Sequence, residues 1–377
     1  METVKGFKDI VGIEAEKFYE VRKIIAETFE KYGFEPAETP IVEQEDFVKS
    51  ESQDEAVSDI FKLKDRGKRN LALRYEFTFQ LKRLMKNKKL PYRRYQIGPV
   101  FRDEPVSLNR LRQFTQCDAD VVNSTFKDEA EILAMTNEIL NKLGIKPIIL
   151  VNNRKLLNEI MDDLKIKEKD KEQALREIDK FDKISEKEIE INLKKIGAEK
   201  FLKALKQGED YFKKFESYKE IIGLMEYCKI FGIKILFSPT VVRGLSYYNR
   251  TVFEIKAKEI KETIVAGGSY IFNNIQCTGI SFGLERISPI AKIKTEKEKY
   301  IIVSLNQDKE ARKLANKLRG IGKICTIYYG KPSKALEYAN AYFIQNAIFV
   351  GEKEKKSGKL KIKDLRTGKE SILKIWL

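Results

Sequence analysis

The hydrophobic pattern of this chain changes three times along its length, and each change limits the folds open to it. From about residue 38 to 123 short alternating runs predict β-strands, and from about 153 to 234 a helical period with high charge takes over. Strand signals then return, and the last part alternates strand and helix. At 377 residues the chain exceeds one typical domain and can bury a large core. We predict an α/β protein divided at 1–152, 153–234, 235–290 and 299–377.

Two segments can be interpreted from their periodicity alone. An amphipathic helix is expected over Glu14–Tyr32, with Gly33 as its stop. The segment 153–234 is either a helical insertion into the sheet region or a set of plain surface helices. The apolar stripe expected on the first helix consists of Phe18, Val21, Ile25, Phe29 and Tyr32.

The last fifth of the chain follows a lysine-rich link, IAKIKTEKEK, and predicts a small α/β domain with a mixed sheet. It contains 18 Lys and Arg and 7 Asp and Glu, so +11 of the chain's net +16 lies there. The tract EKEKKSGKLKIK is interpreted as a basic hairpin. Strands are expected at 300–305, 323–329, 347–351 and near 359–365, and helices at 308–319 and 333–342.

Charge and cysteine usage narrow the class of partner and compartment. A net charge of +16 suggests an acidic partner, nucleic acid before membrane. No apolar run approaches a membrane span, and the start of the chain lacks a signal-peptide pattern. The four cysteines are scattered without a CxxC pair, so we expect neither a protein-built metal site nor disulfides, and a cytoplasmic setting.

The segment VRGLSYYNRTVFE, residues 242–254, carries the most chemical information. Arg243 beside a glycine can approach a ligand closely, and its planar fork suits carboxylate or phosphate oxygens. Tyr247 and Tyr248 offer hydroxyls on rigid apolar bodies, as a pocket for a small polar side chain requires. The following strand places Thr251, Phe253 and Ile255 on one face. Composition alone favours a plainer interpretation, a strand whose aromatic residues are core, and only the other segments of the chain argue against it.

A long hairpin is predicted over residues 93–120. One strand, Arg94 to Phe101, leads to Arg102 and a polar loop that includes Glu104. A second strand follows, and a period of two places Arg110, Arg112, Phe114 and Gln116 on one face with either Asp118 or Asp120. Such a face is a platform for a nucleotide or a charged solvated surface, and the segment alone does not decide between them.

A third segment, TGISFGLERIS at 278–288, predicts a strand that turns into a short helix and presents Glu285 and Arg286. In this order and spacing, the three segments resemble class II aminoacyl-tRNA synthetases. The hairpin is similar to the second motif of the class and GLER to its third, while VRGLSYYNRTVFE resembles the signature of histidyl-tRNA synthetases. The resemblance extends nearly from end to end.

The resemblance implies a fold and a set of roles. The fold would be an antiparallel-sheet catalytic core in two parts, with a helical insertion and an anticodon-binding-like domain at 299–377. Catalytic roles fall on Arg102 and Arg243. ATP binding falls on Arg102, Glu104, Arg110, Arg112, Phe114 and Arg286. Histidine binding falls on Glu76, Thr78, Arg102, Gln116, Asp120, Arg243, Tyr247, Tyr248 and Tyr270.

The chain also departs from the family pattern. Asp120 stands where bacterial members usually carry glutamate, and Ser246 replaces the usual aspartate. The loop GGRYDGL of the family is here GGSYIFN, with Ser269 and Ile271 in place of an arginine and an aspartate. Asn109 replaces a glycine. These changes bear on the shape and support of the site, and none removes a residue assigned to the chemistry.

We therefore expect a histidine–tRNA ligase that uses ATP and Mg²⁺, acts on tRNA(His) and forms a homodimer without membrane association. The alternative is a non-catalytic paralogue that binds histidine or tRNA in a regulatory role. The chain contains no histidine, so no histidine can serve as base, nucleophile or metal ligand. Both genomic composition bias and selection in an enzyme that supplies histidyl-tRNA could explain this absence.

Overall fold

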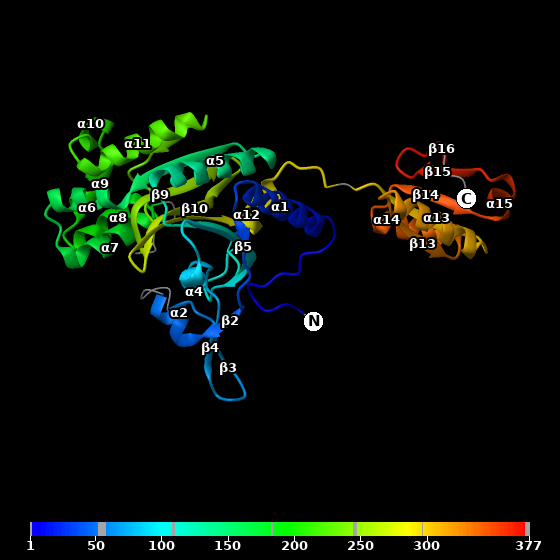
Figure 1. Ribbon diagram of the computed structural model, residues 1–377, viewed down its shortest axis with the longest axis horizontal. Helices are drawn as coiled ribbons and strands as arrows, with labels where there is room; N and C mark the ends of the chain where they lie inside the picture. Colours follow the sequence, from blue (N-terminus) through cyan, green and yellow to red (C-terminus); the bar gives the residue numbers. More distant parts are fainter. Residues whose placement is uncertain are drawn as a thin grey trace. The chain divides into compact units, whose positions relative to one another are not determined.

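A computed structural model of the chain describes residues 2–51, 58–107, 110–181, 184–243, 247–295 and 297–373. The chain divides into two compact units, Met1–Ile293 and Lys294–Leu377, and each has its own sheet (Figure 1). The predicted fold class, α/β with a largely antiparallel main sheet, is confirmed. Among the residues described, none of the helices combines the length and apolar character that crossing a membrane requires.

The main sheet of the first unit has eight strands in the order β1-β5-β6-β11-β10-β9-β7-β8. Its interior pairs are antiparallel, whereas β1 with β5 and β7 with β8 are parallel. This order places the GLER strand β11 beside the hairpin, and β9, which carries the 242–254 segment, one strand further along, beyond β10. The bounds are β1 Glu35–Pro36, β5 Tyr92–Phe101, β6 Gln113–Val122, β7 Pro147–Asn153, β8 Ile235–Phe237, β9 Tyr248–Ala257, β10 Ile260–Phe272 and β11 Ile275–Gly283.

The predicted hairpin is the pair β5–β6, which runs in register from Tyr92↔Val122 to Phe101↔Gln113. Its second strand begins later than expected, so Arg110 and Arg112 precede it. The reason is local: the Arg112 N–H donates to Gly6 O over 2.8 Å, and Arg110 closes a tight bridge with Ser107. These bonds hold both arginines in the loop, so the alternation of β6 does not govern them.

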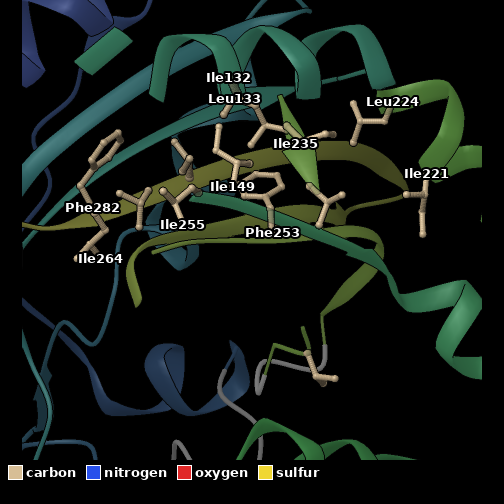
Figure 2. Packing of buried hydrophobic residues seen from close by; sticks show 14 of the residues in the cluster. Ile132, Leu133, Ile149, Ile221, Leu224, Ile235, Phe253, Ile255, Ile264 and Phe282 are labelled. Carbon is tan, nitrogen blue, oxygen red and sulfur yellow. The ribbon is translucent and has the colours of Figure 1, made fainter. Parts of the chain in front are cut away.

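One face of the main sheet carries the hydrophobic core. The first helix, α1 (Gly12–Lys31), packs there with α5 (Phe126–Lys142) and α11 (Glu216–Ile230). The predicted stripe on α1 is confirmed: Val21, Ile25 and Phe29 are fully buried, while Phe18 and Tyr32 pack at the edge of the core. Figure 2 shows Phe253 and Ile255 of β9 pointing into this core among residues of α5, α11 and β11.

The segment 153–234 is helical, as its periodicity predicted, and its helices share the core of the main sheet. Burial of Leu156, Ile178 and Phe201 in that core shows that these are more than surface helices. The bounds are α6 Arg154–Asp163, α7 Glu168–Asp179, α8 Glu186–Lys195, α9 Glu199–Leu205, α10 Glu209–Phe212 and α11 as above. Its treatment as a separate insertion domain stays a prediction.

The first unit also contains a small three-stranded sheet in the order β2-β4-β3, and the helix α4 follows its strand β4 in the chain. After β4 the chain runs through Tyr75 and Glu76 and enters α4 at Thr78. The bounds are β2 Val42–Gln44, α2 Glu45–Glu51, β3 Lys62–Lys64, β4 Asn70–Leu73, α4 Thr78–Leu84 and η1 Met85–Asn87, with α12 Leu284–Ile290 after β11.

The second unit is the predicted mixed-sheet α/β fold. Its order is β13-β12-β14-β15-β16, with parallel pairing among the first three strands and antiparallel pairing after them. The tract EKEKKSGKLKIK is not a hairpin: EKEKKS forms α15, and LKIK begins β15, because Gly358 ends the helix in the left-handed region. The bounds are β12 Lys299–Ser304, α13 Asp308–Gly320, β13 Ile324–Tyr329, α14 Pro332–Ala341, β14 Asn346–Val350, α15 Glu352–Ser357, β15 Leu360–Asp364 and β16 Glu370–Leu373.

Candidate active site

The open face of the main sheet forms the floor of a cleft of about 1390 Å³. Strand alternation explains the floor, because Phe114, Gln116, Asp118 and Asp120 of β6 line the cleft while Cys117 and Ala119 between them face the core. Of the fourteen residues predicted for the site, thirteen line it. They are Glu76, Thr78, Arg102, Glu104, Arg110, Phe114, Gln116, Asp120, Arg243, Tyr247, Tyr248, Tyr270 and Arg286.

Arg112 is the predicted site residue that does not line the cleft. Its Nη2 pairs with Asp103 at 3.0 Å, and its Nε donates to Glu104 O over 3.1 Å. The side chain also covers Gly6, where a Cβ would meet Arg112 Cγ at 2.7 Å. These contacts hold the hairpin loop against the start of the chain, so Arg112 shapes the loop.

Arg102 lies between two aromatic rings at the end of β5. Its guanidinium carbon is 4.3 Å from the ring centroid of Tyr75 and 5.1 Å from that of Phe114. Nearby, Arg110 Nε pairs with Glu104 Oε2 at 2.9 Å. The Arg102 Nε donates to Tyr75 O over 3.4 Å, and stacking on the two rings leaves the other N–H groups at the edge of the guanidinium, where oxygen ligands can meet them.

The cations of the cleft act on one another. Burial, Arg110, Arg102 and Arg243 lower the pKa of Arg286, and Glu262 opposes them. Arg286 is held by a 2.8 Å bond from Nη1 to Thr263 O, and Arg243 Nη1 donates to Glu254 Oε1 over 3.2 Å. Arg243 Nε is buried and has no hydrogen-bond partner within the part of the chain described. Guanidinium groups held close together concentrate positive charge in the cleft, and the resulting field attracts a polyanion.

A buried acidic pocket adjoins these cations. Glu76, Asp118 and Asp120 are 3%, 4% and 3% exposed. Burial is the largest cause that raises the pKa of Glu76 to about 7 and that of Asp118 to about 7, and it also raises the pKa of Asp120. Glu76 Oε1 is buried without a hydrogen-bond partner among the described residues. A cationic ligand with N–H groups would reduce the repulsion among the three carboxylates and would donate a hydrogen bond to Glu76 Oε1.

Three tyrosines wall the acidic pocket. The Tyr270 hydroxyl donates to Asp120 Oδ1 over 2.5 Å. The Tyr247 ring lies 4.8 Å from that of Tyr248 and 5.5 Å from that of Tyr270. Tyr248 interacts with Arg243 and Tyr247. The phenol beside Asp120 is therefore that of Tyr270, whereas Tyr248 supports the arginine.

The sequence reasoning missed two residues of this pocket, Arg94 and Gly279, and left a third, Asp118, open. Arg94 is fully buried and pairs with Asp120 at 3.0 Å, directly opposite in the hairpin register. Asp118, which the sequence analysis gave as an alternative to Asp120, lies on the cleft face together with Asp120. Gly279 is required because a Cβ there would lie 2.0 Å from Asp120 Oδ1, and that contact has no signal in the sequence.

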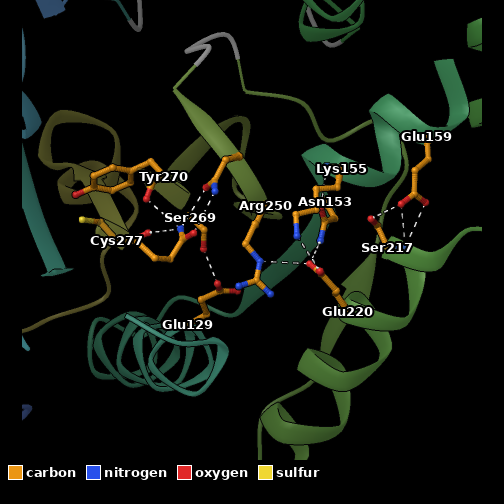
Figure 3. A network of polar contacts seen from close by, with 12 residues as sticks. Glu129, Asn153, Lys155, Glu159, Ser217, Glu220, Arg250, Ser269, Tyr270 and Cys277 are labelled. Atoms are coloured by element: carbon orange, nitrogen blue, oxygen red, sulfur yellow. Dashed lines mark hydrogen bonds and ion pairs between the residues drawn. The ribbon is translucent and has the colours of Figure 1, made fainter. Parts of the chain in front are cut away.

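Residues 267–272 of the altered loop GGSYIFN belong to β10, and a turn of Asn273 and Asn274 joins β10 to β11. A Cβ at Gly267 would lie 2.1 Å from Gly279 O, so its glycine permits close strand approach. Ser269 is fully buried and donates to Glu129 on α5, within the polar network of Figure 3. Ile271 is 46% exposed, so these substitutions lie outside the cleft lining. The departures at Asn109 and Ser246 lie outside the described residues.

Comparisons with known proteins agree with this geometry. The family model for histidyl-tRNA synthetase matches residues 6–287, and that for the anticodon binding domain matches 299–375. Histidine–tRNA ligase 2 of Shouchella clausii is 31% identical over 415 residues, covering 98% of this chain and 97% of the relative. Histidine–tRNA ligase of Clostridium acetobutylicum is 31% identical over 419 residues, with 98% and 97% covered.

Solved structures show the same fold. The histidyl-tRNA synthetase of a Nostoc species superposes with a TM-score of 0.83 at 23% identity, covering 99% of this chain and 96% of that one. A Bacillus halodurans protein described as an ATP phosphoribosyltransferase regulatory subunit/histidyl-tRNA synthetase gives 0.79 at 19% identity, covering 92% and 97%. The two matching models span nearly the whole sequence in the order expected. This chain belongs to the histidyl-tRNA synthetase family.

Proposed function

We propose that the protein is a histidine–tRNA ligase. A histidine carboxylate oxygen attacks the α-phosphorus of ATP, the bond from that phosphorus to the β-phosphate bridging oxygen breaks, and histidyl-adenylate and pyrophosphate form. The 3′-terminal ribose hydroxyl of tRNA(His) then attacks the acyl carbon, and AMP leaves. The chemistry requires fixed cations where negative charge grows, since the carboxylate is already a nucleophile.

The observation that carries this proposal is the convergence of Arg102, Arg243 and Arg286 on one cleft that also contains a buried acidic pocket. Cations suit the triphosphate and the substrate carboxylate, and carboxylates suit an ammonium group. A protein that only bound nucleic acid would have no need for the acidic pocket.

On this proposal the ATP site uses the hairpin and α12. Arg102 would bind the α-phosphate and the histidine carboxylate, Arg286 the γ-phosphate, and Phe114 the face of adenine. Glu104 and Arg110 would line the site, and Arg112 would act on ATP through the loop that it braces. Arg243 would stabilise the charge that develops on the α-phosphate during attack.

The histidine site uses the acidic pocket. Glu76 and Thr78 would hold the ammonium group, and Gln116, Asp120 and Tyr270 the imidazole, with Tyr247 and Tyr248 as walls. Imidazole has one donor and one acceptor nitrogen, so an acceptor and a phenol can read it together. The Tyr270 hydroxyl donates its single proton to Asp120 here, so it would read the acceptor nitrogen of the ring by turning that proton from Asp120 to the substrate.

Magnesium fits this site as an ion that arrives with ATP. Within the described residues there is no group of three or more His, Cys, Asp or Glu that could hold a metal ion. Glu285 accepts from the Thr115 N–H through both oxygens, and Glu104 is paired with Arg110. Mg²⁺ prefers phosphate oxygens with one or two carboxylates. Glu262 of the cleft lining would support the ion, and Glu104 would do so by exchanging Arg110 for it. The ion would supply neutralisation of phosphate charge.

The proposal extends to partners and domains. The second unit, whose range 299–377 carries +11, would bind tRNA(His) as an anticodon-binding domain. Residues 1–152 and 235–290 would form the catalytic core and 153–234 the insertion. A homodimer, which membership of the family suggests, would be able to cover exposed apolar residues of the first unit. They are Val11 at 73%, Ile13 at 51%, Tyr19 at 61% and Val42 at 44%.

A pyrophosphate-exchange assay with all twenty amino acids tests the function. Histidine alone should support exchange, and tRNA should then become charged. A regulatory paralogue that binds histidine without catalysis is the alternative, and the intact arginine set and the basic second unit argue against it. Histidine binding by calorimetry without exchange would establish that alternative.

A further inference from the structure

A short chain of hydrogen bonds runs across the floor of the cleft from Asp118 through Ser281 to Gln116. The two β6 residues lie on one face, and Ser281 of β11 stands opposite Asp118 in the strand register. Ser281 Oγ donates to Asp118 Oδ1 over 2.5 Å, and Gln116 Nε2 donates to Ser281 Oγ over 2.9 Å. All three residues line the cleft.

The direction of these bonds determines which end of the Gln116 amide faces the ligand. A serine hydroxyl has one proton, and an ionised carboxylate can only accept. Since Ser281 gives its proton to Asp118, its oxygen can only accept from the Gln116 amide nitrogen. The amide oxygen is therefore directed elsewhere, and Gln116 Oε1 is buried with no partner in the described part of the chain.

An unpaired buried acceptor is costly unless a ligand satisfies it. The amino-acid substrate offers two kinds of N–H, the ammonium group and the imidazole ring. We propose that Ser281, held by Asp118, is a positioning residue that orients the Gln116 amide so that its oxygen accepts an N–H of the substrate. This inference rests on the proposed function and adds to it two residues, Ser281 and Asp118.

The surroundings of Asp118 are consistent with its role as an acceptor above neutral pH. Burial and Asp120 raise its pKa to about 7, Arg94 and Ser281 oppose the rise, and Glu76 adds to it. At pH 8 the carboxyl is ionised and the hydrogen bonds run in the direction described. The tests therefore belong at pH 8.

Three variants test the inference by pyrophosphate exchange. Ser281→Ala should raise the KM for histidine roughly ten-fold, the scale of one hydrogen bond to a charged group, with the KM for ATP nearly unchanged. Ser281→Thr keeps the hydroxyl and should restore the wild-type KM. Thr278→Val is the matched control, because it removes a buried hydroxyl of β11 that donates to Gly268 O and lies outside the cleft lining.

Two further measurements separate positioning from a general packing effect. In a Gln116→Ala background, Ser281→Ala should add no further increase in the histidine KM, because Ser281 acts through Gln116. Inhibition by histidinol and by imidazolepropionate then identifies the N–H. If Ser281→Ala weakens inhibition by histidinol alone, the N–H belongs to the ammonium group, which imidazolepropionate lacks. If it weakens inhibition by both compounds, the N–H belongs to the ring. Either result supports the inference.

A Ser281→Ala enzyme with the wild-type histidine KM would overturn the inference, as would an equally large effect in the Gln116→Ala background. The result that tests the proposed function is different. If none of the twenty amino acids supports pyrophosphate exchange by the wild-type protein, the ligase proposal fails. The positioning role then fails with it, because there is no substrate to orient.

Discussion

At the scale of single residues, this protein keeps charged groups in places where they are costly, and the cleft accounts for their positions. Glu76, Asp118 and Arg94 are nearly or fully buried beside one another. A fold selected for stability alone would replace them with apolar residues. Their presence together in one pocket indicates that they serve to bind a ligand, which would offset the free energy lost by removing charged groups from water.

Arg243 provides a test of catalysis. Arg243→Ala should lower adenylation by about 10²-fold or more, because a preorganised charge stabiliser is lost, while histidine affinity changes much less. Steady-state exchange gives the rate, and calorimetry gives the affinity. Arg250→Ala is the control, since Arg250 lies seven residues away and pairs with Glu220 outside the cleft. Near wild-type exchange by the Arg243 variant would remove it from the mechanism.

Glu76 provides a test that links stability to pH. Its pKa of about 7 in the folded protein compares with roughly 4.3 in an unfolded chain. Between these values the folded state holds a proton that the unfolded state has released, so this group's contribution to the free energy of unfolding falls as pH rises. Glu76→Gln should therefore be more stable than wild type at pH 8, by on the order of 3 kcal/mol.

That stability difference should shrink as the pH approaches 4.5, and thermal melts across the range would measure it. Histidine binding at pH 8 should weaken at least ten-fold in the same variant, because the charged acceptor for the ammonium group is gone. Glu337→Gln, an exposed glutamate on α14, serves as the control and should change neither property. A pH-independent difference between wild type and Glu76→Gln would contradict the assigned pKa.

At the scale of elements, the close packing of β10, β11 and β6 positions the specificity pocket. Neighbouring strands approach until a Cβ at Gly267 or Gly279 has no room. At Gly267 the obstacle is backbone, whereas at Gly279 it is the Asp120 carboxylate. Gly267 therefore allows the close pairing of β10 with β11, and Gly279 leaves room for the Asp120 carboxylate in the pocket.

Gly279→Ala should weaken histidine binding about ten-fold or more, because the added methyl displaces Asp120 from Tyr270 and Arg94. Gly267→Ala should instead lower the melting temperature, since backbone must move. Gly223→Ala on α11, where nothing lies within 4 Å, should stabilise by roughly 0.5–1 kcal/mol. Calorimetry and thermal melts on the three variants distinguish these effects, and equal affinity of wild type and Gly279→Ala would exclude a role for Asp120 placement.

At the scale of the whole molecule, the two compact units divide the proposed reaction. The first unit contains the cleft, and the second carries most of the net positive charge. A chain ended at Ile293 should retain histidine-dependent pyrophosphate exchange and lose most aminoacylation, mainly through a higher KM for tRNA. Intact protein should also bind tRNA more weakly as salt rises, because phosphate contacts release counterions.

The control for the truncation is its own melting curve, which should show a cooperative transition like that of the intact protein. Equal aminoacylation by the truncated and intact proteins would mean that the lysines of the second unit only maintain solubility. A salt-independent affinity for tRNA would lead to the same conclusion.

The sequence by itself determined the order of elements and most of the members of the site. The period of α1, the β5–β6 hairpin, the inward and outward residues of β9 and the alternation in the second unit all follow from local patterns. Thirteen of the fourteen residues that the family resemblance assigns to the site line the cleft, and the motifs that carry this resemblance are short runs of sequence. Such signals are local, so one chain is enough to reveal them.

Only the tertiary structure decided how those residues meet. That Arg112 braces a loop, that Arg94 pairs with Asp120, and that Tyr270 lies at Asp120 while Tyr248 supports Arg243 all depend on contacts between distant segments. The raised pKa values of Glu76 and Asp118 arise from burial by other strands, and Gly279 is required because a carboxylate from another strand occupies the space of its side chain. Burial, register and close approach are properties of the packed chain, because desolvation and steric exclusion act between segments that the sequence keeps far apart.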